Sequence, residues 1–185
     1  MSTVSAQDSR PVQIRGVLIR TAIGGAIVFA ILWFAFRNQP GLAEAFARVR
    51  FHPHAPDLSV LLQASPAIQI HFATVMLALL IGVYQLSGPK GVTLHRVLGW
   101  GWVVLMVVTA VSAFFIREVN HGALSPIHLL ADWTLIAAPL GLAFARRHNV
   151  RRHSRTMYGL FFGGLILAGL LAFMPGRIMW RMFFG

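Results

Sequence analysis

The sequence predicts an all-α integral membrane protein, a single bundle of five transmembrane helices without a separate soluble domain. Two observations lead to this prediction. Of the 185 residues, 57% are hydrophobic and only 11% are charged, whereas about 25% of residues are charged in a typical soluble domain. The apolar residues also fall into long runs, and a run of roughly 20 residues crosses a bilayer as a helix.

The amino-terminal part contributes one predicted span. Residues 1–16 are a polar tail, and residues 17–36 form the first transmembrane helix, with Arg20 close enough to its start to reach the headgroups. A signal peptide is the alternative for this segment, but the small residues around Ala43 and Ala45 lie too far beyond the apolar run, so we expect a retained anchor. Residues 37–66 form an outer loop in which the segment GLAEAFARVR is expected to lie as a surface helix.

The remaining spans form a four-helix core over residues 67–174. Glycine and proline residues indicate where helices end, after the second span in SGPKG and after the last span at Pro175 and Gly176. Residues 175–185 then form an interfacial tail. The four predicted spans of the core cover residues 67–86, 97–116, 127–145 and 157–174.

The distribution of positive charge predicts the orientation. The chain has 16 Lys and Arg against 5 Asp and Glu, and these cations cluster in short segments between apolar runs, which indicates membrane orientation and not nucleic-acid binding. The amino-terminal tail, the turn before the third span and the segment RRHNVRRHSR carry most of them on one side. The amino terminus is therefore expected in the cytoplasm and the carboxyl terminus outside, in the inner membrane of a bacterium, where anionic lipids contact the cations.

Histidine is the main candidate metal ligand, because the chain has 8 histidines and no cysteine. Disulfides, iron–sulfur clusters and covalent c-type haem are thereby excluded. His71 and His128 fall near the outer ends of the second and fourth spans, and His95 and His153 near the inner ends of the third and fifth. This alternation is the arrangement that two haems b need, each held between imidazoles of facing helices. At 1.5 Å per residue the two layers lie roughly 25 to 30 Å apart.

Two charged residues have expected roles beside these histidines. Asp132 follows His128 by four residues, so its carboxylate can reach back and orient the imidazole, although a structural hydrogen bond or a proton relay explains it equally well. Arg96 lies where a haem propionate would emerge. The glycines at helical spacing in the fifth span, Gly159 and Gly163, indicate close helix packing more than a notch for a flat cofactor.

The chain also resembles a bacterial membrane-protein family catalogued as domain of unknown function 2306. The segments HFATVMLALLIGVYQL, LHRVLGWGWV, SPIHLLADWTL, ARRHNVRRHSRTMYGLFFGGLILAG and FMPGRIM carry the resemblance, which runs from about Ala67 to the carboxyl terminus. One departure is Arg117 before Glu118, where the family would have histidine. The resemblance implies no established activity. It does imply that seven positions belong to the family pattern: His71, Gln85, His95, Arg96, Gly99, His128 and His153.

The depth pairing further resembles, in architecture alone, di-haem b cytochromes in which helices two and four hold one haem and three and five the other. We therefore expect an electron carrier across the bilayer, with two haems b and a quinone or a redox protein as partner. Two alternatives stay open. The histidines and Asp132 would move protons or a small solute in a transporter, or the bundle would be a structural subunit of a membrane complex.

Overall fold

The computed structural model describes residues 52–116 and 127–185, and its regular structure within these ranges is helical. Several predicted features lie outside the described residues. They are the amino-terminal tail, the first span, the surface helix GLAEAFARVR, and the pair Arg117 and Glu118.

Four helices of the described part are long and apolar enough to cross a membrane, which confirms a helical, multi-pass membrane protein. They are α4 (Pro66–Ser87), α5 (Thr93–Ala113), α6 (His128–Arg146) and a continuous helix over Val150–Ala172. This last helix is composed of α7 (Val150–Gly159), the π-helical stretch η2 (Leu160–Leu167) and α8 (Ala168–Ala172).

Two helices begin earlier than the apolar runs indicate. α5 starts at Thr93 and not at residue 97, and α7 starts at Val150 and not at residue 157. Hydrophobicity marks the part of a helix in lipid, whereas polar residues continue the same helix into the headgroup region. Asn149 fixes the start of α7, because its side chain accepts a hydrogen bond from the Arg152 amide.

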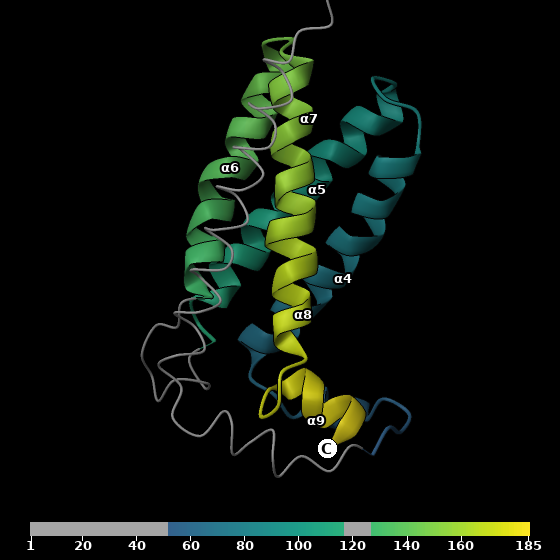
Figure 1. The fold of residues 1–185 in the computed structure, drawn as a ribbon, viewed down its shortest axis with the longest axis vertical. Coiled ribbons are helices and arrows are strands. Elements are labelled where there is room, and N and C mark those ends of the chain that lie inside the picture. The colour runs from purple at the N-terminus through teal and green to yellow at the C-terminus, as the bar shows by residue number, and fades with distance from the viewer. Residues whose placement is uncertain (1–51, 117–126) are drawn as a thin grey trace, which may run out of the picture. The chain divides into compact units, whose positions relative to one another are not determined.

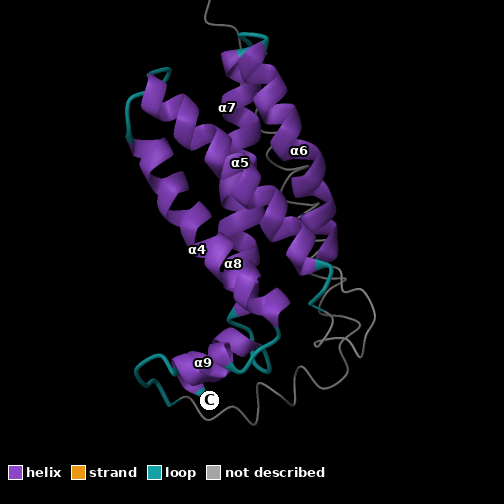
Figure 2. Cartoon of the chain, turned by 180° about the vertical axis from the view of Figure 1, so that it is seen from behind, coloured by secondary structure: helices purple, strands orange, loops and turns teal. Residues whose placement is uncertain are grey.

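The four long helices form two antiparallel hairpins, α4–α5 and α6–α7, and α5 packs against α6 between them. Figures 1 and 2 show both hairpin turns at the same end of the described bundle, with α9 at the other end. We call these two ends the hairpin end and the α9 end. By the charge argument above, the hairpin end is the one predicted to face the cytoplasm.

The core lies where the two hairpins meet, and small residues allow the helices to approach closely there. A Cβ on Gly82 of α4 would lie 2.6 Å from Cε2 of Phe161 in η2. Gly159 and Gly163 face the indole of Trp133, with Cβ positions 3.5 Å from its ring atoms. Packing thus accounts for this glycine pair. The buried core cluster consists of Ala78, Trp102, Val103, Met106, Ala137, Ala138, Leu160, Phe161 and Leu165.

Two short helices pair at the α9 end. They are α3 (Leu58–Leu62), within the predicted outer loop, and α9 (Ile178–Phe184), within the predicted interfacial tail. The Asp57 amide donates to the Met182 carbonyl at 2.9 Å, and the Asp57 carboxylate accepts from the Ser59 amide at 2.9 Å to begin α3.

Candidate cofactor-binding cleft

A cavity of about 690 Å³ lies at the hairpin end between the two hairpins. All four long helices contribute to its wall, and its volume falls in the range of about 300–1,000 Å³ that is usual for cofactor and small-molecule sites. Five of the seven positions that the family resemblance singles out line it. These are Gln85, His95, Arg96, Gly99 and His153.

His95 and His153 face each other across this cleft. His95 lies in the first turn of α5 and His153 in the first turn of α7, so the unpredicted early start of both helices fixes both side chains on regular backbone. Their ring centroids are 6.5 Å apart and their planes cross at 85°. The structure therefore brings together the histidine pair predicted at the inner ends of the third and fifth spans.

The hydrogen bond of His153 fixes which ring nitrogen carries the proton. Nδ1 lies 2.9 Å from the backbone carbonyl oxygen of Gly141. Because a carbonyl only accepts, Nδ1 must donate, and a neutral ring then keeps its lone pair on Nε2. Metal-ligating histidines usually have this arrangement, in which the second nitrogen donates to a carbonyl or a carboxylate.

Gln85 supports the opposite wall at His95. Its side-chain Nε2 donates to the His95 backbone carbonyl at 2.9 Å, which ties the start of α5 to α4. Gly99 leaves room for this contact, since a Cβ there would lie 3.2 Å from the same nitrogen. Both residues thus act on the position of His95.

The floor of the cleft is aromatic. Trp102 is 5% exposed and Phe161 is 6% exposed, and the indole Nε1 of Trp102 donates to the Ala78 carbonyl at 2.9 Å. Both side chains pack over Gly82. An apolar floor below a pair of imidazoles suits a ligand with a flat, apolar body.

Cations from three segments line the wall, namely Lys90 in the α4–α5 turn, Arg96 in α5 and Arg146 in α6. The Lys90 Nζ donates to the carbonyls of Leu86 and Gly88, both at 2.7 Å, and so closes the carboxyl end of α4. Arg96 and Arg146 are exposed. A ligand with anionic groups at one edge therefore matches the charge of this wall.

His148, for which the sequence predicts no role, also lines the cleft. It lies in the tight turn between α6 and α7 with a φ of 55°, a left-handed conformation that histidine adopts more readily than most residues. The only available signal was its place in a turn of three residues between two polar helix ends. The structure also adds Trp102, Met157 and Phe161 to the wall.

His71 and His128, the predicted outer pair, both bind to α5 at the α9 end. The His71 Nδ1 lies 3.0 Å from the Thr109 carbonyl oxygen, and the His128 Nε2 lies 3.2 Å from the carbonyl oxygen of Ala113, one turn further along α5. The two histidines thus lie at similar depth. They differ in the nitrogen that donates, because His71 uses Nδ1 and His128 uses Nε2.

Hydroxyl groups surround His71. The hydroxyl of Ser112 lies 3.0 Å from Nδ1 and donates to the Thr109 carbonyl at 2.9 Å, and the Thr109 hydroxyl donates to that of Thr74 at 2.8 Å. The Thr74 hydroxyl in turn donates to the backbone carbonyls of Ile70 and His71. Because the chain of hydroxyl donors terminates at backbone carbonyls, this network holds the His71 ring in place.

Asp132 lies in the second turn of α6 and is exposed, whereas His128 is 6% exposed. The predicted role of Asp132 in orienting His128 stays a prediction. Among the residues that the structure describes, no three His, Cys, Asp or Glu side chains lie close enough to hold a metal ion together. A metal held by two axial imidazoles needs no such group.

Comparison with known proteins gives one match. A family model described as a predicted membrane protein (DUF2306) matches residues 68–183. This range contains both histidine pairs and every residue that lines the cleft. No curated protein and no solved structure matches the chain.

Proposed function

The chain belongs to the DUF2306 family of predicted membrane proteins, and from the geometry of its cleft we propose that it is a b-type cytochrome, a membrane electron carrier with haem b between His95 and His153. Haem b supplies a reversible one-electron change at iron and is held in proteins by axial side chains such as histidine. The ring separation of this pair carries the proposal.

The measured separation agrees with axial ligation of one metal. With metal–nitrogen bonds of about 2 Å, two imidazoles on opposite sides of one ion have their ring centroids roughly 6 Å apart. The observed value is 6.5 Å. The hydrogen bond from His153 Nδ1 to Gly141 leaves Nε2 as the ligand atom and holds the ring against rotation.

The rest of the cleft suits the two ends of such a cofactor. Trp102 and Phe161 offer apolar surface to a macrocycle, and Arg96 and Arg146 offer guanidinium groups to its two propionates. Gln85 holds the backbone at His95, so this chain's own residues position both ligands.

The outer pair supports a second haem less directly. His71 already donates Nδ1–H to the Thr109 carbonyl, as a ligand would, but His128 has to give up its bond to Ala113 before its Nε2 can ligate. We therefore propose that the cleft loads first. Haem content per chain, measured after limited haem supply, should approach one before it approaches two.

The test is a reduced-minus-oxidised absorption spectrum of protein purified from haem-replete cells. We expect Soret and α-band changes in the native protein, and loss of the cleft contribution in His95→Ala and in His153→Ala. His52→Ala is the matched control, because His52 is exposed and lies before α3.

His153→Gln is a second variant that retains a polar side chain and separates loss of a ligand from loss of folding. A native protein without these bands would overturn the proposal, and so would variants of the cleft that keep the full signal. A colourless protein with pH-dependent solute flux would instead favour the transporter alternative.

A further inference from the structure

A second group of cations lies at the hairpin end and does not line the wall of the cleft. Arg147 lies in the α6–α7 turn, and Arg151 and Arg155 are one turn apart on α7. All three are exposed. Residues four apart share one face of a helix, so Arg151 and Arg155 form one stripe.

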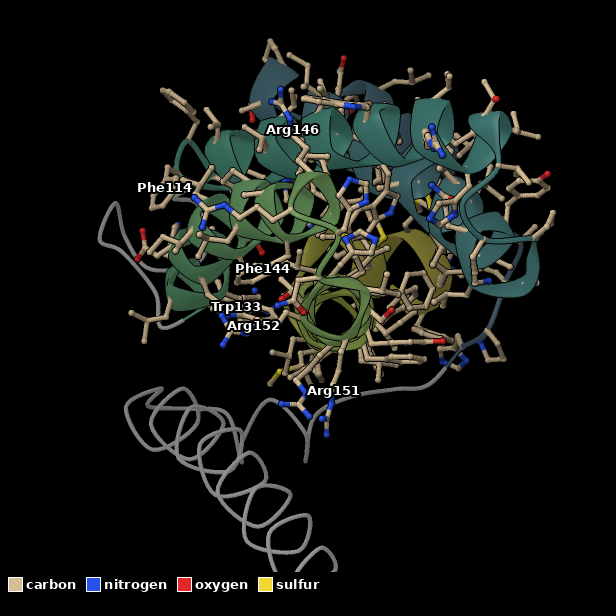
Figure 3. The ribbon with its side chains drawn as sticks, turned by 90° about the horizontal axis from the view of Figure 1, so that it is seen from above. Phe114, Trp133, Phe144, Arg146, Arg151 and Arg152 are labelled. Carbon is tan, nitrogen blue, oxygen red and sulfur yellow. The ribbon has the colours of Figure 1, made fainter. Side chains whose placement is uncertain are left out.

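This stripe lies outside the cleft wall. α7 gives His153, Ser154 and Met157 to the cleft wall, while Arg151 and Arg155 do not belong to it. Figure 3, viewed from the hairpin end, shows Arg151 extending away from the bundle. Arg152 is different, because its guanidinium lies 5.8 Å from the centre of the Phe144 ring and packs on the protein itself.

The hairpin end has no compensating negative charge among the described residues. The carboxylates in that part of the chain are Asp57, before α3, and Asp132, near the start of α6, and both lie toward the α9 end. Positive-inside orientation explains that cations gather at this end. It does not require that exposed arginines outside the cleft wall share one helix face, as Arg151 and Arg155 do.

We propose that Arg147, Arg151 and Arg155 form a docking surface for an acidic, water-soluble electron-transfer protein, which delivers an electron to the cofactor in the cleft. The electron-transfer role rests on the proposed function. The docking itself rests on charge, because surfaces of opposite sign raise association rates and set the orientation of the encounter.

The experiment uses the full-length protein in nanodiscs of zwitterionic lipid, which leave both faces accessible. Reduced flavodoxin is the acidic probe. In the forward reaction, flavodoxin hydroquinone loses one electron and the ferric site gains it, which stopped-flow absorbance follows. We expect a rate constant with flavodoxin that falls at least tenfold between low and high salt.

Arg151→Glu and, separately, the milder Arg151→Gln test the surface. Arg151→Glu should lower the low-salt rate constant with flavodoxin about three- to tenfold, and Arg151→Gln should lower it less. The matched control is Arg181→Glu on α9, an exposed arginine at the other end of the bundle, which should stay within about twofold of the native protein.

Two results would overturn the docking surface. One is an equal rate for Arg151→Glu, Arg181→Glu and the native protein, and the other is loss of the flavodoxin effect once anionic lipid is added to the discs, because headgroups then hold these arginines. Flavodoxin capture by the discs is measured in parallel at low and high salt. A colourless protein that still captures flavodoxin in a salt-dependent way would refute the haem and retain the docking surface.

Discussion

Replacing Gly82 by alanine should disturb the floor of the cleft, because the added methyl group would clash with Phe161 and contact Trp102. A Cβ at this position would lie 2.6 Å from Phe161 Cε2, 2.7 Å from Phe161 Cδ2 and 3.0 Å from Trp102 Nε1. Carbon atoms in contact are about 3.5–4.0 Å apart, so the Phe161 ring has to retreat by roughly 1 Å. Trp102 is tied to the Ala78 carbonyl, and the cleft that Phe161 lines is the open side.

Overpacking of this kind costs about 1–3 kcal/mol. In a chain of this length each kcal/mol lowers the melting temperature by roughly 2–4 °C, so Gly82→Ala should melt roughly 2–12 °C below the native protein. Tryptophan fluorescence in detergent follows the melting. On the proposed function, the same variant should also retain less haem after purification, because the displaced ring occupies the floor of the site.

Gly101→Ala is the control, since a Cβ at that helical position meets no atom within 4 Å. It should melt at or slightly above the native temperature, because alanine is the better helix former. The double variant Gly82→Ala with Phe161→Leu should recover part of the loss, as leucine lacks the clashing ring atoms. If Gly82→Ala and Gly101→Ala melt together, α4 and η2 do not approach as closely as the structure has them.

The other predictions concern a second glycine and the cap of α3. Gly141→Ala should destabilise the protein less than Gly82→Ala, because its Cβ would meet the flexible end of Met157, which can move away, and thermal melting compares the two variants. Hydrogen bonds from Ser59 lower the pKa of Asp57 below its usual 3.8. A carboxyl group whose pKa is lower in the folded protein stabilises the folded state at pH values above its unfolded pKa. This contribution is lost as the pH falls through the folded pKa. Hydrogen-exchange protection of the α3 amides should therefore fall when the pH drops below about 4, and Asp57→Asn, which also caps helices, should remove this dependence.

Much of the bundle could be predicted from hydrophobicity, because lipid requires long apolar helices. The four described spans lie where the apolar runs indicate. Helix ends were harder, since α5 and α7 continue through polar residues that no apolar pattern marks. The first span and its loop lie outside the described residues, so those predictions stay open.

The histidine pairs show what depth alone can and cannot predict. Spacing along the chain fixes the depth of a residue in the bilayer and predicts one depth for His95 and His153, whose ring centroids lie 6.5 Å apart. Which way a ring points depends on the rotation of each helix and on nearby acceptors. For His71 and His128 these acceptors are carbonyls of α5, at Thr109 and Ala113, which no sequence pattern reveals.

The same physics explains why the cleft lies at the hairpin end. Toward the α9 end the hairpins can close, because Gly164 of η2 has only a hydrogen where a Cβ would lie 3.5 Å from Met106 Cε of α5. Beyond the Gly82 contact the facing side chains include imidazoles and the cations Arg96 and Arg146, which cannot pack into an apolar core. Like charges on the two walls also oppose closure. An anionic ligand removes this repulsion, so binding at the cleft should stabilise the hairpin end as well as fill it.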